Sequence, residues 1–142
     1  TGFRETVQVE YDDTVISLPQ LLFTFFAVID PETPNRQGPD FGSQYQTGVY
    51  WTDPADEAVI RSIAAREAAA VPFFAVELKP LACFYPAEPH HQRYLEKHPR
   101  GYCHVAPWKL AALPDYPFST ADYDRPAKVL LRAWTERRET EP

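Results

Sequence analysis

Three side chains near the start of this sequence have the type and setting for acid–base chemistry. Glu5 lies in a stretch that alternates apolar and polar residues, and partial burial there would raise its pKa and suit it to donate a proton. The simpler alternative is a surface carboxylate paired with Arg4. Asp40 and Tyr45 lie five residues apart in a segment rich in glycine and proline, which can aim a carboxylate and a phenol at one polar ligand atom. Ordinary turn chemistry is the alternative for both residues.

The two cysteines differ in setting. Cys103 lies between Gly101 and His104, in a glycine-containing turn, and an accessible thiol beside a histidine suits redox chemistry. Cys83 stands at the end of an apolar stretch and is predicted to be a structural, buried thiol. Two cysteines do not form a secreted disulfide framework, so we expect a reducing, cytoplasmic location.

The histidines give a poor metal-binding pattern. His90 and His91 are adjacent, and neighbouring side chains on a helix point in different directions. His98 and His104 add no repeated spacing of the kind that zinc sites show. The sequence therefore predicts neither a metal site nor a bound cofactor.

The elements that must position these residues follow from periodicity and punctuation. The first part of the chain is predicted to form a strand at about 4–11, a buried helix at 18–29 capped by Ser17, and a long loop at 30–44. A strand at 46–51, a helix from about 52 to 69 and a strand at 73–78 follow. The last part is predicted to form a short polar helix at 87–97, an irregular segment from 103 to 124, and an amphipathic basic helix at 125–138. This order predicts an α/β (α+β) fold, a loop-rich two-layer sandwich of a mixed sheet with helices. The long loop is the first place to look for a site, because such loops are often functional.

Composition excludes two classes of partner. The net charge is −6, and residues 1–60 contain ten acidic residues against two arginines. A nucleic-acid partner is not expected, because binding it requires a basic surface. The longest apolar run, Leu21 to Ile29, is interrupted by Thr24 and is far shorter than the roughly 18 to 20 residues that span a bilayer. The sequence contains no methionine, so we expect it to begin within a longer reading frame or to be a processed product.

Several segments together resemble the A-type peptide methionine sulfoxide reductases. They occur in the family's order and spacing: ETVQVEYD at 5–12, DPETPNRQGPDFGSQY at 30–45, FYPAE at 84–88 followed by His91-Gln92 and Tyr94-Leu95, and GYC at 101–103. The resemblance covers about residues 1–105, which we interpret as a reductase-like domain. Residues 106–142 would then form a C-terminal extension.

The resemblance implies a role for four residues. Glu5 would protonate the sulfoxide oxygen, Tyr45 would donate a hydrogen bond to the same oxygen, and Asp40 would position the substrate and its water. Cys103 matches the family's resolving cysteine, which forms a disulfide with the oxidised nucleophile. The implied substrate is peptide-bound or free methionine-S-sulfoxide, and the implied external reductant is thioredoxin. We expect Glu5, Asp40 and Tyr45 to converge around one small cavity.

The sequence also departs from the family. The family's nucleophilic cysteine lies in a Gly-Cys-Phe-Trp motif that this chain does not contain. The resemblance is therefore to the C-terminal two-thirds of a reductase, without the family's first strand and helix, which predicts an exposed sheet edge. A complementing N-terminal chain, a swapped dimer or the C-terminal extension could cover that edge. Phe3 and Ile29 stand where the family commonly has histidine.

Three functional hypotheses follow. In the first, the chain is a reductase whose nucleophilic segment lies elsewhere. In the second, it is a non-catalytic relative that binds oxidised methionine or a partner protein. In the third, Cys103 or Cys83 has become the nucleophile.

Overall fold

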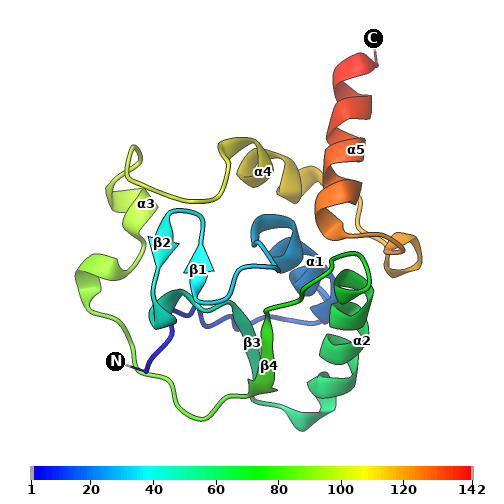
Figure 1. The fold of residues 1–142 in the computed structure, drawn as a ribbon. Coiled ribbons are helices and arrows are strands. Elements are labelled where there is room, and N and C mark those ends of the chain that lie inside the picture. The colour runs from blue at the N-terminus through cyan, green and yellow to red at the C-terminus, as the bar shows by residue number, and fades with distance from the viewer. Residues whose placement is uncertain (1, 142) are drawn as a thin grey trace.

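A computed structural model describes residues 2–141 as helices arranged around two short sheets (Figure 1). The α-helices are α1 (Leu18–Val28), α2 (Glu57–Ala68), α3 (Tyr94–Lys97), α4 (Pro107–Ala112) and α5 (Ala127–Thr140). The strands are β1 (Arg36–Gln37), β2 (Asp40–Phe41), β3 (Gly48–Trp51) and β4 (Glu77–Pro80). Short 3-10 helices are η1 (Ser43–Tyr45), η2 (Pro54–Asp56), η3 (Pro89–His91), η4 (Leu113–Asp115) and η5 (Thr120–Asp122). This mixture of helices and small sheets confirms the predicted α+β class.

The two sheets have different geometry. Strands β3 and β4 pair in parallel, with Gly48 opposite Glu77 and Trp51 opposite Pro80, and α2 lies in the connection between them. Strands β1 and β2 form a small antiparallel hairpin within the segment predicted to be a loop. Gly38, in the turn of this hairpin, has a φ of 56°, a left-handed conformation that favours glycine.

The helix α1 confirms the prediction for residues 18–29 almost to the residue. The Ser17 side chain accepts a hydrogen bond from the backbone N–H of Gln20, and Pro19 occupies the first turn, where its missing N–H costs nothing. Most of the helix is apolar, and Phe23, Phe26 and Ala27 are buried. A local start signal followed by an apolar stretch is sufficient to define this element.

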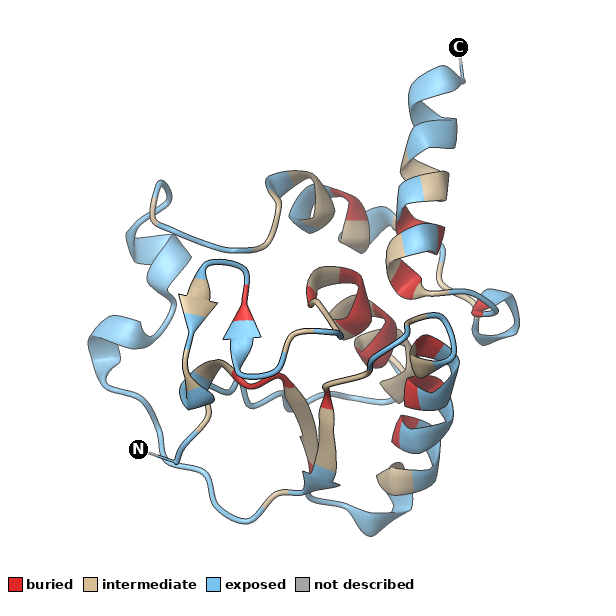
Figure 2. Ribbon diagram, viewed as in Figure 1, coloured by how far each residue is buried: buried red, intermediate tan, exposed pale blue. Residues whose placement is uncertain are grey.

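Within residues 2–141, one hydrophobic core joins α1, α2, α4 and α5 to the β3–β4 sheet (Figure 2). Its buried members lie in α1, β3, α2, α4 and α5 or in residues close to the ends of these elements and of β4: Leu22, Phe23, Phe26, Ala27, Ile29, Trp51, Ile60, Ile63, Ala64, Val76, Ala112, Tyr123, Ala127, Leu130 and Leu131. The C-terminal segment contributes Tyr123 and Leu131 to this core, and Phe23 of α1 lies edge-on to the Tyr123 ring at 5.3 Å. Residues 106–141 therefore share their core with the preceding part of the chain.

One buried carboxylate attaches the C-terminal helix. Glu67 of α2 is 4% exposed and accepts hydrogen bonds from the Tyr123 hydroxyl at 2.6 Å and from the backbone N–H of Ala127 at 2.9 Å. Ala127 opens α5, so a negative side chain at this point also interacts favourably with the positive end of the helix dipole. Burial and the Glu67 hydrogen bond raise the pKa of Tyr123, which keeps its hydroxyl protonated as a donor.

The predicted strand at 4–11 is wrong. Within residues 2–141, this segment pairs with no strand, and Val7 and Val9 are 84% and 55% exposed. The reason is that a strand needs a neighbour to receive its backbone hydrogen bonds, and alternation of apolar side chains does not supply one.

Other predicted elements differ in extent. Instead of a strand at 73–78, β4 begins at Glu77, and instead of one helix at 87–97, η3 and α3 are separated by Arg93 in a left-handed conformation with φ of 51°. The segment 103–124 was predicted to be irregular but contains α4. The basic helix predicted at 125–138 is confirmed as α5. Among the helices of residues 2–141, none combines the length and the hydrophobicity that a membrane span requires.

Candidate active site

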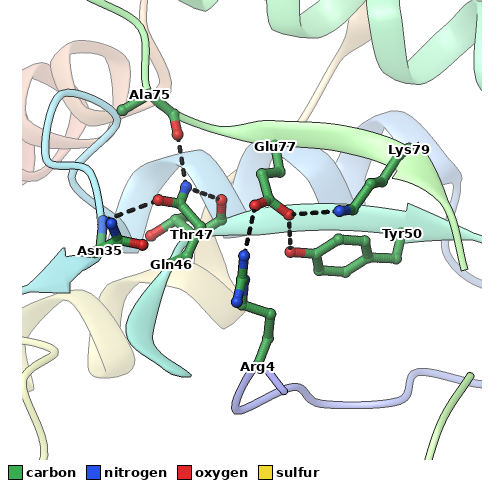
Figure 3. Close-up of polar contacts among 8 residues, drawn as sticks. All are labelled: Arg4, Asn35, Gln46, Thr47, Tyr50, Ala75, Glu77 and Lys79. Atoms are coloured by element: carbon green, nitrogen blue, oxygen red, sulfur yellow. Dashed lines mark hydrogen bonds and ion pairs between the residues drawn. The ribbon is translucent and has the colours of Figure 1, made fainter. Parts of the chain in front are cut away.

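Two buried glutamines hold the segment 30–45 in place. The Gln37 side chain bonds the backbone of Asp30 through both of its ends, accepting from the N–H at 3.0 Å and donating to the carbonyl at 2.9 Å. The Gln46 side chain accepts from the Asn35 N–H at 2.8 Å and donates to the carbonyl of Ala75 at 2.7 Å (Figure 3). These side-chain amides form hydrogen bonds with the backbone groups of an irregular segment, as a neighbouring strand does in a sheet.

Glu5 is connected to this segment through its backbone. Its N–H donates to the carbonyl of Gln44 at 2.8 Å, which places Glu5 beside the residue that precedes Tyr45. The Glu5 side chain is exposed and the Tyr45 side chain is half-buried. Two of the predicted site residues thus lie on adjoining segments.

Asp40 is connected to the turn that carries Cys103. The Tyr102 hydroxyl donates to the Asp40 carboxylate at 3.0 Å, across 62 residues of sequence. Partial desolvation, the hydrogen bond to Asp40 and the nearby Cys103 and Tyr45 raise the pKa of Tyr102. Tyr102 therefore connects the hairpin that carries Asp40 to the turn that carries Cys103, and the sequence predicted no such contact.

Arg4 does not pair with Glu5. Its guanidinium donates to Glu77 of β4 at 2.9 Å, and the same carboxylate receives the Tyr50 hydroxyl at 2.7 Å and Lys79 at 3.3 Å (Figure 3). This network fastens the unpaired N-terminal segment to the β3–β4 sheet. It also leaves Glu5 without its expected partner, so the surface ion pair offered as the simpler interpretation of Glu5 is absent from the described residues.

The network shifts the pKa values of its members. Burial and the hydrogen bond to Glu77 raise the pKa of Tyr50 to about 12. Burial alone would raise the pKa of Glu77, but the hydrogen bonds from Arg4 and Tyr50 outweigh it and hold the pKa below its ordinary value of 4.5. A carboxylate with a depressed pKa stabilises the fold above its unfolded-state pKa and loses that contribution as the pH falls.

We therefore expect Glu77→Gln to be destabilised by about 1 to 2 kcal/mol at pH 7, because a charge-assisted interaction is lost. The difference from the wild-type protein should shrink as the pH falls below 4.5 and Glu77 becomes protonated. Urea unfolding at pH 7 and pH 3 measures both values, with the exposed Glu32→Gln as the control. A difference that stays constant between the two pH values contradicts this assignment.

Two shallow surface hollows lie away from Glu5, Asp40 and Tyr45. One is lined by Tyr94, His98 and Gly101 among others, and the other by residues that include Arg66 and Thr120. The small cavity expected among the three acid–base residues stays a prediction. Their catalytic roles, and that of Cys103, stay predictions as well.

Both cysteines are free and exposed. This agrees with an accessible thiol at Cys103, but the prediction of a buried Cys83 is wrong. Strand β4 ends at Pro80, and the chain from 82 onward runs over the surface instead of continuing the buried face of the sheet. Exposure alone therefore does not distinguish the two thiols.

The comparison with known proteins extends over most of the chain. The sequence profile described as "Peptide methionine sulfoxide reductase" matches residues 1–113. The chain belongs to this family. The peptide methionine sulfoxide reductase MsrA of Clostridium perfringens is 45% identical over 106 residues, which are 74% of this chain and 68% of the relative. The MsrA of Lachnoclostridium phytofermentans is 45% identical over 108 residues, covering 74% and 64%.

The fold agrees with that of a solved structure. The crystal structure of Mxr1 from Saccharomyces cerevisiae in reduced form matches with a TM-score of 0.64 and 36% sequence identity. The match covers 68% of this chain and 55% of the yeast chain. This methionine sulfoxide reductase family member thus spans about two-thirds of its bacterial relatives and little more than half of the yeast protein.

Proposed function

We propose that this chain provides the proton donor and the resolving thiol of a peptide methionine sulfoxide reductase, while another segment provides the nucleophilic cysteine. Family membership supports the reaction class. The observation that carries the assignment to these residues is the meeting of three separated motifs. The Glu5 N–H reaches Gln44, and Tyr102 reaches Asp40, so the segments bearing Glu5, Asp40, Tyr45 and Cys103 adjoin.

In the proposed reaction, a thiolate from the other segment attacks the sulfur of methionine-S-sulfoxide while Glu5 gives its proton to the oxygen. Tyr45 donates a hydrogen bond to that oxygen and Asp40 positions the substrate. The sulfur–oxygen bond of the substrate breaks, methionine leaves, and the oxygen, with the proton from Glu5, is transferred to the attacking cysteine, which becomes a sulfenic acid. The Cys103 thiol then attacks the sulfenic sulfur, forming a disulfide and releasing water.

An external dithiol must reduce that disulfide by thiol–disulfide exchange, and we propose thioredoxin for this role. Turnover of this kind requires a compartment that keeps thiols reduced, so we propose a cytoplasmic location. We further propose residues 1–105 as the reductase-like unit and residues 106–142 as an extension. Glu67 would hold the extension on the unit through Tyr123 and the first residue of α5.

The test is reconstitution with a peptide that carries the family's Gly-Cys-Phe-Trp motif, either fused ahead of Thr1 or added in trans. We expect reduction of a methionine-S-sulfoxide substrate only with the peptide present, first with dithiothreitol and then with thioredoxin. The same peptide with serine in place of cysteine is the control. Activity of the chain alone, abolished by Cys103→Ser or Cys83→Ser, would instead support a nucleophile within this chain.

The exposure of the Glu5 side chain favours a second candidate, a non-catalytic relative that binds oxidised methionine or a partner protein. A general acid gains most from a desolvated setting, which an exposed carboxylate does not have. Binding of a methionine-sulfoxide peptide without turnover, even after reconstitution, would support this candidate.

A further inference from the structure

Three metal-binding side chains meet at one point on the surface, on the segment between β4 and α3. One ligand atom from each of Glu88, His90 and His91 lies within 4.8 Å of the other two. His90 Nδ1 is 3.4 Å from a carboxylate oxygen of Glu88, and the two imidazole rings lie 4.0 Å apart between centroids. The expectation that these neighbouring histidines diverge is therefore wrong.

The backbone explains why two of the three side chains, Glu88 and His91, lie near each other. The segment Pro89–His91 forms the 3-10 helix η3, and the His91 N–H donates to the Glu88 carbonyl at 2.9 Å. Glu88 is the extended residue that precedes this helix, and the hydrogen bond from His91 to its carbonyl brings the two residues to the same turn.

Contacts from outside the turn hold it in this form. The Lys97 ammonium donates to the Pro89 carbonyl at 2.6 Å, and the Gln92 side chain donates to the Ala87 carbonyl at 3.1 Å. Pro89 restricts the backbone further because its ring fixes φ. The ligand set is thus built on a turn with its own supports rather than on a free loop.

We propose that Glu88, His90 and His91 bind a borderline divalent metal ion of the Zn²⁺ type. Two imidazole nitrogens and one carboxylate oxygen suit Zn²⁺, Co²⁺ or Ni²⁺, whereas Mg²⁺ and Ca²⁺ prefer oxygen ligands alone. Ligands about 2.0 to 2.2 Å from a tetrahedral ion lie roughly 3.4 Å apart. Glu88 and His90 already have this separation, and the other ligand atoms, which lie within 4.8 Å of one another, must close by up to about 1.4 Å. All three are exposed, and rotation about their side-chain bonds can supply that movement.

Occupation of this site bears on the proposed function. The chain just before it packs against the N-terminal segment, where the rings of Phe3 and Tyr85 lie 5.4 Å apart in an edge-to-face arrangement. Phe3 is two residues from Glu5. The proposed metal site is thus three residues along the chain from a contact with the segment that carries Glu5, and any effect of the ion on Glu5, unlike the binding itself, rests on the proposed function.

Calorimetric titration of the full, tag-free chain with Zn²⁺ tests the proposal, in a Cys83→Ser, Cys103→Ser background that removes competing thiols. We expect one site, with the dissociation constant raised at least about tenfold by His90→Ala or His91→Ala and by Glu88→Gln. His98→Ala and His104→Ala alter the remaining two histidines and should leave the affinity unchanged. Mg²⁺ should give no heat of binding.

The proposal is overturned if His90→Ala and His91→Ala leave the zinc affinity unchanged. It is also overturned if His98→Ala and His104→Ala lower the affinity as much as those two substitutions do. Circular dichroism of each variant establishes that it is folded, and the spectrum of bound Co²⁺ gives a second readout of coordination by histidine. Zinc binding is measured without substrate, so its result does not depend on whether reductase reconstitution succeeds. Absence of zinc binding would likewise leave the reconstitution result unchanged.

Discussion

Replacing Glu67 by alanine is expected to lower the free energy of unfolding by about 3 kcal/mol, because two buried donors lose the acceptor that they share. The carboxylate is the shared acceptor for the Tyr123 hydroxyl and the Ala127 N–H, and those residues are 1% and 0% exposed. Without Glu67, both donors stay buried with no acceptor, and each unsatisfied group costs about 1 to 3 kcal/mol. Urea unfolding followed by circular dichroism measures the loss of stability.

Helix α2, which carries Glu67, also provides a matched control. Glu57 opens α2 and pairs with Arg61 on the surface at 3.0 Å, so Glu57→Ala should change stability by less than about 1 kcal/mol. Tyr123→Phe removes one of the two donors, and its loss of stability should lie between those of Glu67→Ala and Glu57→Ala. Limited proteolysis should cut Glu67→Ala faster than the wild-type protein between α4 and α5. Equal urea midpoints for Glu67→Ala and Glu57→Ala would contradict the anchoring role.

Replacing Glu5 by glutamine is expected to lower the turnover of the reconstituted reductase by about 10² to 10⁴-fold, the usual contribution of a general acid. Glutamine keeps the size and polarity of the side chain but has no acidic proton to transfer to the leaving oxygen. The Glu5 side chain is exposed, and its backbone bond to Gln44 is unaffected by the change. Single-turnover assays with methionine-S-sulfoxide measure the chemical step directly.

Glu10→Gln is the control for this experiment, since Glu10 is an exposed carboxylate five residues further along the same segment. It should retain full turnover. Unfolding by urea should give the same midpoint for Glu5→Gln and the wild-type protein, which separates loss of chemistry from loss of fold. Turnover of Glu5→Gln within about threefold of that of Glu10→Gln would remove Glu5 as the acid.

Local signals predicted the elements that depend on local interactions. The helix α1 begins with the Ser17 cap and Pro19 and continues through an apolar stretch, all of which are legible in adjacent residues. The segment 4–11 has an equally regular alternation but forms no strand in the described chain, because strand formation depends on a neighbour that the pattern does not specify. The alternation at 4–11 therefore shows that these residues suit a strand, but it does not show whether another strand pairs with them.

In the candidate site, too, local patterns predicted the residues but not their long-range contacts. Family motifs predicted which residues to examine, but no local signal indicated that Tyr102 bonds Asp40 or that Glu77, 73 residues away, binds Arg4. These are long-range contacts of polar side chains, which leave no periodic trace in the sequence.

Glu67 is an intermediate case. It falls on the buried stripe of α2 after Ile60 and Ile63, so helical periodicity could have identified it as a buried acid that requires partners. The sequence would still not have indicated which donors satisfy it.

The far end of α5 offers an attachment point. Leu130 and Leu131 are buried and Trp134 is half-buried, but residues 136–141 are exposed, and the helix extends away from the other elements (Figures 1 and 2). A dye, a resin or a fused domain placed after the last turn would meet none of the core. The chain could thus be immobilised by its tail, with the hairpin β1–β2 left open to solution.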